Sequence, residues 1–235
     1  MKTSKNGNGS VIIKTLKNNL AGMRQRVIYY QRKLLDEIKL RRSAEKKALT
    51  DPLTEAFNLR GFGMRFEEEY ANFRRYGFDT ALIFIDVDNF KSFNSEYGQK
   101  TGDEVLKSLV GEIRNVIRPS DSVHKIGGEE FVILLSKINL RSDDATTFTP
   151  DEAVINAYRV TERIRKSIEG LEIEPYNGNG KTVRVTISAG VALLSEAKDR
   201  DLLIDYANRA EREAKDEGKN RTYIFYDGKI VKNPL

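Results

Sequence analysis

The stretch KIGGEEF, residues 125–131, contains two glycines followed by two glutamates. Apolar residues lead into it over 123–126 and follow it over 131–135, a pattern that predicts a β-hairpin with a Gly-Gly turn. Glycines let a phosphate come close to the backbone, and a carboxylate directly after them can hold a hard cation against that phosphate. An ordinary hairpin turn with solvated glutamates explains the same residues, so this stretch alone leaves both interpretations open.

A second stretch upstream of the hairpin carries matching chemistry. Its apolar run over residues 81–85 is typical of a central strand buried on both faces, and the sequence DVDNFK, residues 86–91, follows directly. A buried strand that ends in carboxylates, beside a hairpin that also presents carboxylates, predicts a divalent-metal site. Lys91 adds a positive charge, which suits the phosphates of a nucleotide.

With these motifs the chain resembles the GGDEF-domain diguanylate cyclases, in the form whose signature reads GGEEF. The resemblance runs from residue 51 to residue 221. Several motifs found in the family's order are more specific than any one alone. They are DPLT (51–54), DVDNFK (86–91), GDEVL (102–106), GGEEF (127–131), ISAGV (187–191) and AK (214–215).

The resemblance implies an α+β fold with a palm-like βαββαβ core of the ferredoxin type, as in nucleotide polymerases and cyclases. We expect this catalytic domain over residues 51–235, with helices on one face of a largely antiparallel sheet. Asn58 and Thr149 are predicted helix N-caps, the latter with a capping box to Glu152. Further helices are predicted over 102–117 and 199–217, and further strands over 80–87, 171–176, 181–194 and 222–226, with Asn177-Gly178-Asn179-Gly180 as a hairpin turn and 136–149 as a polar loop.

Residues 1–50 are predicted to hold a disordered start, residues 1–10, and then a helical coiled-coil stalk that ends before Asp51-Pro52. Large side chains recur there at alternating spacings of four and three, at Leu16, Leu20, Met23, Val27, Tyr30 and Leu34. We expect this stripe to form the seam of a dimer. Packing of the stripe against the chain's own globular domain is the alternative.

Composition limits the possible partners and metals. The chain has 235 residues, no cysteine and one histidine, so a metal site should use oxygen ligands, and a reducing, cytoplasmic location is expected. No apolar run approaches the roughly 18 residues of a membrane span. Residues 1–49 carry 13 Lys/Arg and 3 Asp/Glu. Such a basic arm could bind nucleic acid or an anionic membrane, but its charges alternate with the apolar stripe, so a solvated helix face is favoured and no nucleic-acid partner is expected.

The resemblance implies that two GTP molecules are condensed into cyclic di-GMP, with release of two pyrophosphates, by a homodimer joined through the N-terminal helix. It implies two Mg²⁺ ions per active site, for which Mn²⁺ can substitute, held by Asp86, Glu129 and the Val87 carbonyl. Asp86, Glu129 and Lys91 are the expected catalytic residues. Glu129 would take the proton of the ribose 3′-hydroxyl, and Lys91 would stabilise charge on the phosphate.

The resemblance also assigns residues to the substrate. Asn94 and Asp103 match residues that hydrogen-bond the guanine edge, and an aspartate that accepts from guanine donors would disfavour adenine. Lys215 matches a lysine on the triphosphate. The other expected substrate-binding residues are Phe90, Gln99, Gly127, Gly128 and Lys219.

A regulatory site is implied by the sequence RPSD, residues 118–121. It matches the family's inhibitory RxxD motif, where Arg118 and Asp121 would grip the product, and Arg163 matches the arginine that completes that grip. Arginine suits both phosphate and the face of guanine. A helix-capping turn with an ion pair is the alternative interpretation of the same residues.

Several positions depart from the family pattern. Lys219 stands where arginine is usual and Gln99 where histidine is common, while Glu55-Ala56 replace Gly-Leu. In the last helix, Asn208, Glu211 and Arg212 replace aspartate, leucine and tyrosine. None of these changes removes an expected metal ligand. Two rival functions stay open: a domain that senses cyclic di-GMP or GTP without turnover, and an interaction protein whose basic helix binds nucleic acid or membrane. The intact signature favours an active enzyme.

Overall fold

The computed structural model describes residues 7–139, 149–176 and 181–234. It separates into two compact units, one ending at Ala48 and the other running from Leu49 to Leu235. The first unit is built on one long helix, α1 (Gly7–Leu49). Residues 7–10 therefore belong to a helix, where the sequence led us to expect disorder.

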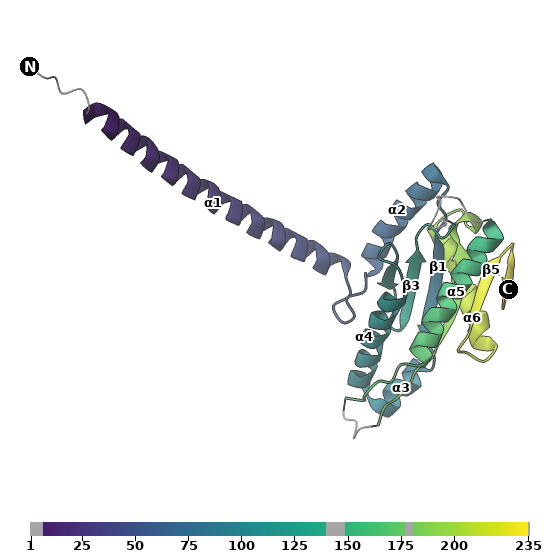
Figure 1. The fold of residues 1–235 in the computed structure, drawn as a ribbon. Coiled ribbons are helices and arrows are strands. Elements are labelled where there is room, and N and C mark those ends of the chain that lie inside the picture. Colours follow the sequence, from purple (N-terminus) through teal and green to yellow (C-terminus); the bar gives the residue numbers. More distant parts are fainter. Residues whose placement is uncertain (1–6, 140–148, 177–180, 235) are drawn as a thin grey trace, which may run out of the picture. The chain divides into compact units, whose positions relative to one another are not determined.

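A six-stranded sheet forms the centre of the second unit, with the order β2-β3-β1-β4-β5-β6 (Figure 1). The central strand β1 pairs antiparallel with β3 on one side and with β4 on the other, and β4 pairs parallel with β5. The first four strands thus have the order of a βαββαβ core of the ferredoxin type, as expected. The strands are β1 (Ala81–Val87), β2 (Ser122–Lys125), β3 (Glu130–Leu135), β4 (Ile187–Leu193), β5 (Thr222–Tyr226) and β6 (Lys229–Val231).

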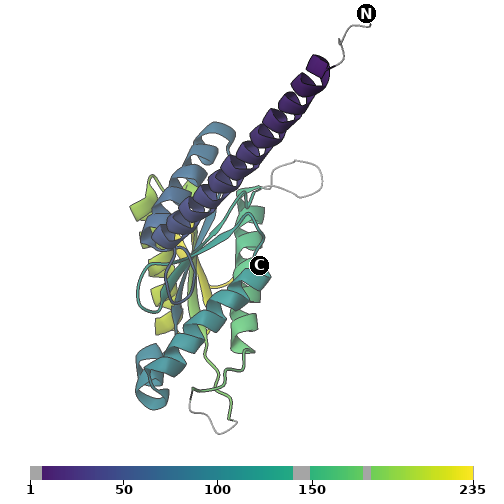
Figure 2. The ribbon, with the colours of Figure 1, turned by 90° about the vertical axis from the view of Figure 1, so that its left-hand side faces the viewer.

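Helices cover both faces of this sheet, so the expectation that they lie on one face was wrong. Ile83 and Ile85 of β1 pack with α4 and α5, whereas Leu82 and Phe84 pack with α2 and α6. Alternate residues of a strand point to opposite faces, and Figure 2 shows the two helix pairs on opposite sides. A continuously apolar β1 needs cover on both faces. The helices are α2 (Leu59–Tyr76), α3 (Phe90–Tyr97), α4 (Gln99–Val116), α5 (Pro150–Glu169) and α6 (Arg200–Asp216).

Local capping signals were predicted correctly. Asn58 accepts a hydrogen bond from the Gly61 backbone N–H at 3.0 Å and caps α2. Thr149 and Glu152 form the expected capping box at the start of α5. These contacts involve residues three apart in the chain, so they can be read without knowledge of the tertiary structure.

Four elements differ from the sequence-based predictions. Helix α3 was not predicted, because eight residues are too few for a helix to be stable without tertiary contacts. Its Phe90 and Phe93 rings stack on each other. The predicted strand over 171–176 is not a strand, and the predicted strand over 181–194 is one only over Ile187–Leu193. Before β4, Ile173 and Val183 form one isolated bridge. Strand β6 was missed, although Asp227-Gly228 is a hairpin-turn sequence. The predicted turn over 177–180 and residues 140–148 of the predicted loop lie outside the described residues.

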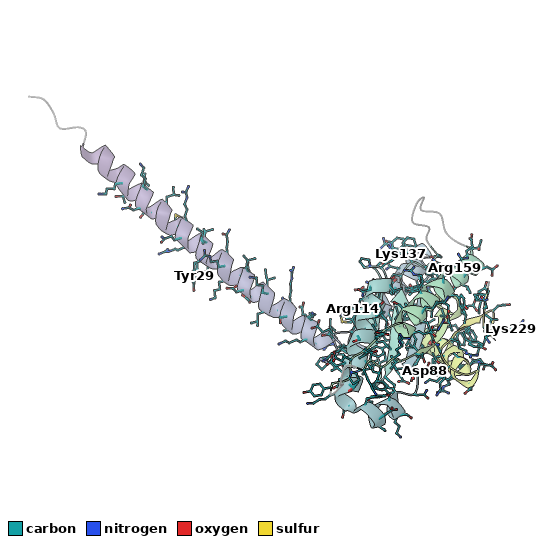
Figure 3. The ribbon with its side chains drawn as sticks, turned by 60° about the horizontal axis from the view of Figure 1, so that its bottom comes forward. Tyr29, Asp88, Arg114, Lys137, Arg159 and Lys229 are labelled. Carbon is teal, nitrogen blue, oxygen red and sulfur yellow. The ribbon has the colours of Figure 1, made fainter. Side chains whose placement is uncertain are left out.

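The apolar stripe of α1 is open to solvent along its length. All six side chains of the stripe are at least 52% exposed in the chain. Tyr29, next to the stripe, projects from α1 in Figure 3 and stacks edge-on against Tyr30. A helix with a continuous exposed apolar stripe is the pattern of a coiled-coil strand.

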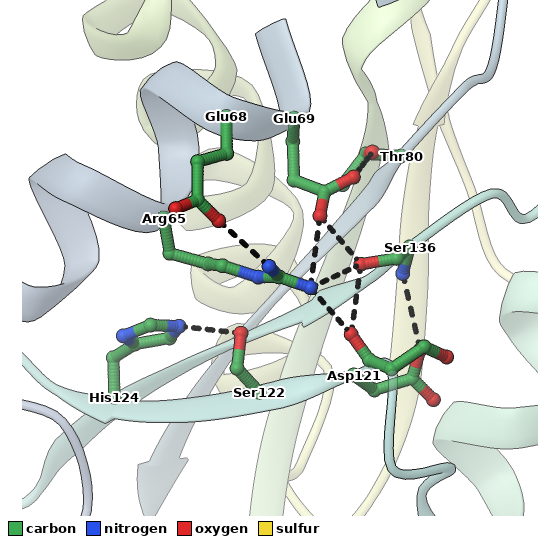
Figure 4. Close-up of polar contacts among 9 residues, drawn as sticks. Arg65, Glu68, Glu69, Thr80, Asp121, Ser122, His124 and Ser136 are labelled. Carbon is green, nitrogen blue, oxygen red and sulfur yellow. Dashed lines mark hydrogen bonds and ion pairs between the residues drawn. The ribbon is translucent and has the colours of Figure 1, made fainter. Parts of the chain in front are cut away.

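Buried polar side chains on the α2 face are hydrogen-bonded to one another (Figure 4). The Glu69 carboxylate accepts from the hydroxyl groups of Ser136 at 2.8 Å and Thr80 at 3.1 Å, and pairs with Arg65 at 3.1 Å. His124 is fully buried between Phe57 and Phe62, and one ring nitrogen lies 2.9 Å from the Ser122 hydroxyl. Burial and the nearby Arg65 charge lower the pKa of His124 to about 3.

The buried His124 makes stability depend on pH. In the unfolded chain, His124 takes up a proton as the pH falls below its ordinary pKa of 6.5. In the folded chain its pKa is about 3, so the side chain stays neutral at higher pH. Stability from this group is therefore complete above pH 6.5 and is lost as the pH falls. Between pH 8 and pH 5 we expect a loss of about 2 kcal/mol.

We expect His124→Phe to remove that loss, as measured by urea unfolding at pH 8 and pH 5. His124 is the only histidine in the sequence, so no other imidazole contributes to the difference between the two proteins. The pH dependence is compared within each protein, so any change of packing in the variant cancels. An unchanged loss in His124→Phe would contradict the assignment.

Candidate functional site

The hairpin between β2 and β3 lies beside the end of β1. Asp86, the next-to-last residue of β1, stands directly opposite Glu130 in the antiparallel register. The backbone N–H groups of Ile126 and Gly127 donate to the Glu130 carbonyl at 3.1 and 3.3 Å and close the turn. A Cβ on Gly127 would lie 2.3 Å from the Glu130 carboxylate, so the Glu130 side chain would have to move, whereas Gly128 faces open space.

A cavity of about 780 Å³ opens between this turn, α3 and α4. It brings together seven of the residues that the sequence assigned to substrate or catalysis, from three separate segments of the chain. They are Phe90, Lys91, Asn94, Gln99, Asp103, Gly128 and Glu129. Sequence reasoning missed Leu53, Ser95, Leu106 and Lys125, which also line the cavity. A signal existed for three of them, since Leu53, Leu106 and Lys125 belong to the quoted stretches DPLT, GDEVL and KIGGEEF, and none of the three had been given a role.

Close packing of α3 on α4 shapes one end of the cavity. A Cβ on Gly102 would lie 1.9 Å from Asn94 Oδ1 and 3.2 Å from the ring of Phe90, so glycine is required there. Asn94 Oδ1 is buried and has no hydrogen-bond partner among the residues that the structure describes. The next residue, Asp103, lines the same cavity from α4. The two side chains therefore offer oxygen acceptors at one end of the cavity.

The remaining expected site residues do not line the cavity. Asp86 and Lys215 form an ion pair in which Lys215 Nζ lies 3.0 Å from Asp86 Oδ2. Lys219 donates its Nζ hydrogen to Asn89 Oδ1. Val87 is buried, and Gly127 lies in the turn next to the Glu130 side chain. Glu129 lines the cavity, and its charge acts on Asp86, so the cavity and the Asp86 ion pair are neighbouring sites.

The electrostatics at Asp86 favour a bound cation. Burial raises the pKa of Asp86, the Lys215 ammonium opposes this shift, and the nearby charges of Glu129 and Glu130 raise the pKa further. Lys215 already places a positive charge next to the Asp86 carboxylate. Within the described parts of the chain no group of three or more His, Cys, Asp or Glu side chains is placed to hold a metal. The expected ligand set, two carboxylates and one backbone carbonyl, is smaller than such a group, and its oxygens are the donor type that Mg²⁺ prefers.

The second aspartate of DVDNFK has a structural role. Asp88, labelled in Figure 3, is buried and accepts hydrogen bonds from the hydroxyl groups of Thr186 at 2.6 Å and Ser188 at 2.7 Å. The Asn220 backbone N–H donates to it at 3.0 Å. These bonds tie the end of β1 to the segments around β4 and β5, so Asp88 holds the strand end in place beside Asp86.

Glu211 lies beside the Asp86 ion pair, and sequence reasoning noted it only as a departure from the family pattern. It lies on α6, is 2% exposed, and places Oε1 3.0 Å from Lys215 Nζ. Burial raises the pKa of Glu211 to about 6, with Lys215 opposing the shift and Asp86 and Asp88 adding to it. Because a carboxylate replaces an apolar residue of the family pattern there, its charge was the available signal.

The RPSD turn follows α4. Asp121 accepts hydrogen bonds from the backbone N–H of Arg118 at 2.9 Å and of Ser136 at 3.1 Å, as Figure 4 shows for Ser136. The Arg118 side chain is exposed. Arg163 of α5 donates to the Val116 carbonyl at 3.2 Å, so it reaches the end of α4 shortly before Arg118. Asp121 thus closes the turn, and the two arginines flank the same end of α4.

Comparison with known proteins identifies the domain type. Residues 48–221 match the family described as "Diguanylate cyclase, GGDEF domain". The chain is 33% identical over 179 residues to the diguanylate cyclase DgcP of Pseudomonas aeruginosa, and the match covers 76% of this chain but 24% of DgcP. The chain therefore spans about a quarter of the length of this relative. None of the helices in the described residues is both long enough and apolar enough to cross a membrane.

Two solved structures share the fold. Diguanylate cyclase SiaD of P. aeruginosa, solved with its activator SiaC, matches with a TM-score of 0.67 at 24% identity, over 93% of this chain and 77% of that one. A structure of the coiled coil and GGDEF domain of DgcB from Caulobacter crescentus, solved with c-di-GMP, matches with a TM-score of 0.66 at 22% identity. That match covers 90% of this chain and 100% of the DgcB chain.

Proposed function

Because this chain belongs to the GGDEF-domain diguanylate cyclase family, we propose that it condenses two GTP molecules into cyclic di-GMP. Each ribose 3′-hydroxyl attacks the α-phosphate of the other nucleotide, the bond to the β-phosphate breaks, and pyrophosphate leaves. The observation that carries the proposal is the cavity that brings together Lys91, Asp103 and Glu129. Around this one cavity, Lys91 would contact a phosphate, Asp103 would accept hydrogen bonds from the base, and Glu129 would supply a carboxylate.

The charged residues divide the chemical work. Asp86, Glu129 and the Val87 carbonyl would hold Mg²⁺, which when bound neutralises charge on the phosphates. Glu129 accepts the proton of the 3′-hydroxyl as general base. Lys91 stabilises the negative charge that grows on the α-phosphate oxygens, and Lys215 contacts the triphosphate.

Base selection follows from the other end of the cavity. Guanine presents N–H donors at N1 and N2, which suit the acceptor oxygens of Asn94 and Asp103. Adenine presents an acceptor at N1, so it would leave a buried acceptor unpaired. Phe90 and Gln99 contribute surface to the same cavity. We therefore propose GTP over ATP as the substrate.

A homodimer is part of the proposal, since one domain has one set of these residues and the product joins two nucleotides. The exposed stripe of α1 supplies an apolar surface for a second copy of the chain. The similar DgcB structure also contains a coiled coil beside its GGDEF domain. A paired stalk raises the effective concentration of one domain near the other.

We also propose that cyclic di-GMP binds at the RPSD turn and inhibits the enzyme. The Arg118 side chain is exposed on a turn whose backbone Asp121 holds closed, and Arg163 lies at the same end of α4. Two guanidinium groups suit the phosphates and guanine faces of a cyclic dinucleotide.

Glu129→Gln tests the reaction. With the base removed, we expect product formation to fall by about 100-fold or more, while thermal unfolding stays unchanged, because Glu129 lies in a turn and fills no core volume. Product is measured by mass spectrometry after incubation with GTP and Mg²⁺. Glu104→Gln is the control, because it makes the same charge change at a residue of α4 that pairs with Lys107. Normal turnover in Glu129→Gln would reject the assignment.

Arg118→Ala tests the inhibitory site. We expect the affinity for cyclic di-GMP, measured by calorimetry, to fall roughly tenfold or more, because a charge-assisted hydrogen bond is lost. The initial rate of synthesis should stay as in the wild type. Arg159→Ala on α5 is the control, because that side chain is exposed and outside the turn. Equal affinity in Arg118→Ala and the control would dismiss the site.

Leu20→Glu combined with Val27→Glu tests the seam. Four like charges would face one another in the dimer, so we expect a folded monomer by analytical ultracentrifugation, with a specific activity that rises with protein concentration. Asn18→Glu with Gln25→Glu is the control, because both positions lie opposite the stripe and are exposed. A monomeric variant that keeps full activity at nanomolar concentration would separate the stripe from catalysis.

A further inference from the structure

Lys215 stands between two carboxylates, one of which belongs to the proposed cation site. Its ammonium nitrogen lies 3.0 Å from Asp86 Oδ2 and 3.0 Å from Glu211 Oε1. Lys215 therefore bridges the two carboxylates at the end of β1.

The surroundings of Glu211 differ from those of another buried carboxylate, Glu69. Glu69 has two hydroxyl donors in addition to an arginine. Glu211 is equally buried, but its Oε1 has no hydrogen bond among the described residues, and its contact is the ion pair with Lys215. A buried carboxylate with a single flexible partner contributes little to stability by itself. Its presence at this position therefore suggests a role in placing Lys215.

The position of Glu211 is fixed by backbone packing. A Cβ on Gly190 of β4 would lie 2.2 Å from the Glu211 backbone nitrogen and 2.0 Å from the Ala207 carbonyl oxygen. Helix α6 thus lies directly on the sheet at this point. Lys215 is one helical turn further on the same face, and its longer side chain is 32% exposed. Glu211 is the fixed partner of this pair, and Lys215 is the one that can move.

We propose that Glu211 is a positioning residue that keeps the Lys215 ammonium at the active site when Asp86 takes up a cation. This inference rests on the proposed function, in which Asp86 binds Mg²⁺ and Lys215 binds the triphosphate. Asp86 cannot hold a divalent cation and the ammonium equally, because the two positive charges repel each other. Glu211 then remains as the partner of Lys215 and holds it where it meets a phosphate.

Glu211→Gln tests the proposal, with Glu213→Gln as the matched control, because Glu213 is exposed on the same helix. Binding of inorganic triphosphate in saturating Mg²⁺ is measured by calorimetry on the full chain. We expect a roughly tenfold loss of affinity in Glu211→Gln and wild-type affinity in the control. Glu211→Leu, which removes hydrogen bonding as well, should show at least the same loss.

A double-mutant cycle separates positioning from a structural effect. In a Lys215→Met background, Glu211→Gln should leave triphosphate affinity unchanged, because there is no ammonium to hold. Equal affinity of the wild type and Glu211→Gln, or the same loss in the Lys215→Met background, would overturn the inference. The binding result does not depend on turnover. Failure to make cyclic di-GMP would reject the proposed function, while cyclic di-GMP synthesis with unchanged triphosphate affinity would reject the role of Glu211 alone.

Discussion

The pairing of β1 on both sides is the constraint on which the structure depends. Its backbone is held between β3 and β4, and its side chains are buried on both faces of the sheet. Both faces must then be covered by helices, and the chain can present polar groups only where the strand ends. Asp86 lies at that end, opposite Glu130. The site is at this edge because the apolar run stops there.

The buried carboxylates differ in the kind of partner that they have. Asp88 and Glu69 accept hydrogen bonds from hydroxyl groups that are themselves fixed by the sheet and helices. Asp86 and Glu211 depend instead on one lysine with a flexible side chain. Glu69 also forms an ion pair with Arg65. An acid neutralised by a mobile ammonium can exchange it for another cation.

The two compact units use apolar surface in opposite ways. The second unit buries its apolar side chains in two clusters, one on each face of the sheet. The helix α1 leaves a regular apolar stripe exposed, between charged side chains that keep it in water. The exposed stripe is the surface that we propose pairs two copies of the chain.

The sequence by itself determined the features that depend on near neighbours: the buried run of β1, the hairpin after Lys125, the caps at Asn58 and Thr149, and the stripe of α1. The motif resemblance supplied the family and the expected roles of Asp86 and Glu129. Only the tertiary structure decided that helices cover both faces, that α3 packs on Gly102, that Leu53 and Lys125 line the cavity, and that Glu211 lies 3.0 Å from Lys215. Those features depend on contacts between segments far apart in the chain, whose distances no local pattern records. The Glu211 and Lys215 spacing was visible in the sequence, but the direction in which that helix face points was set by the close approach of α6 to Gly190.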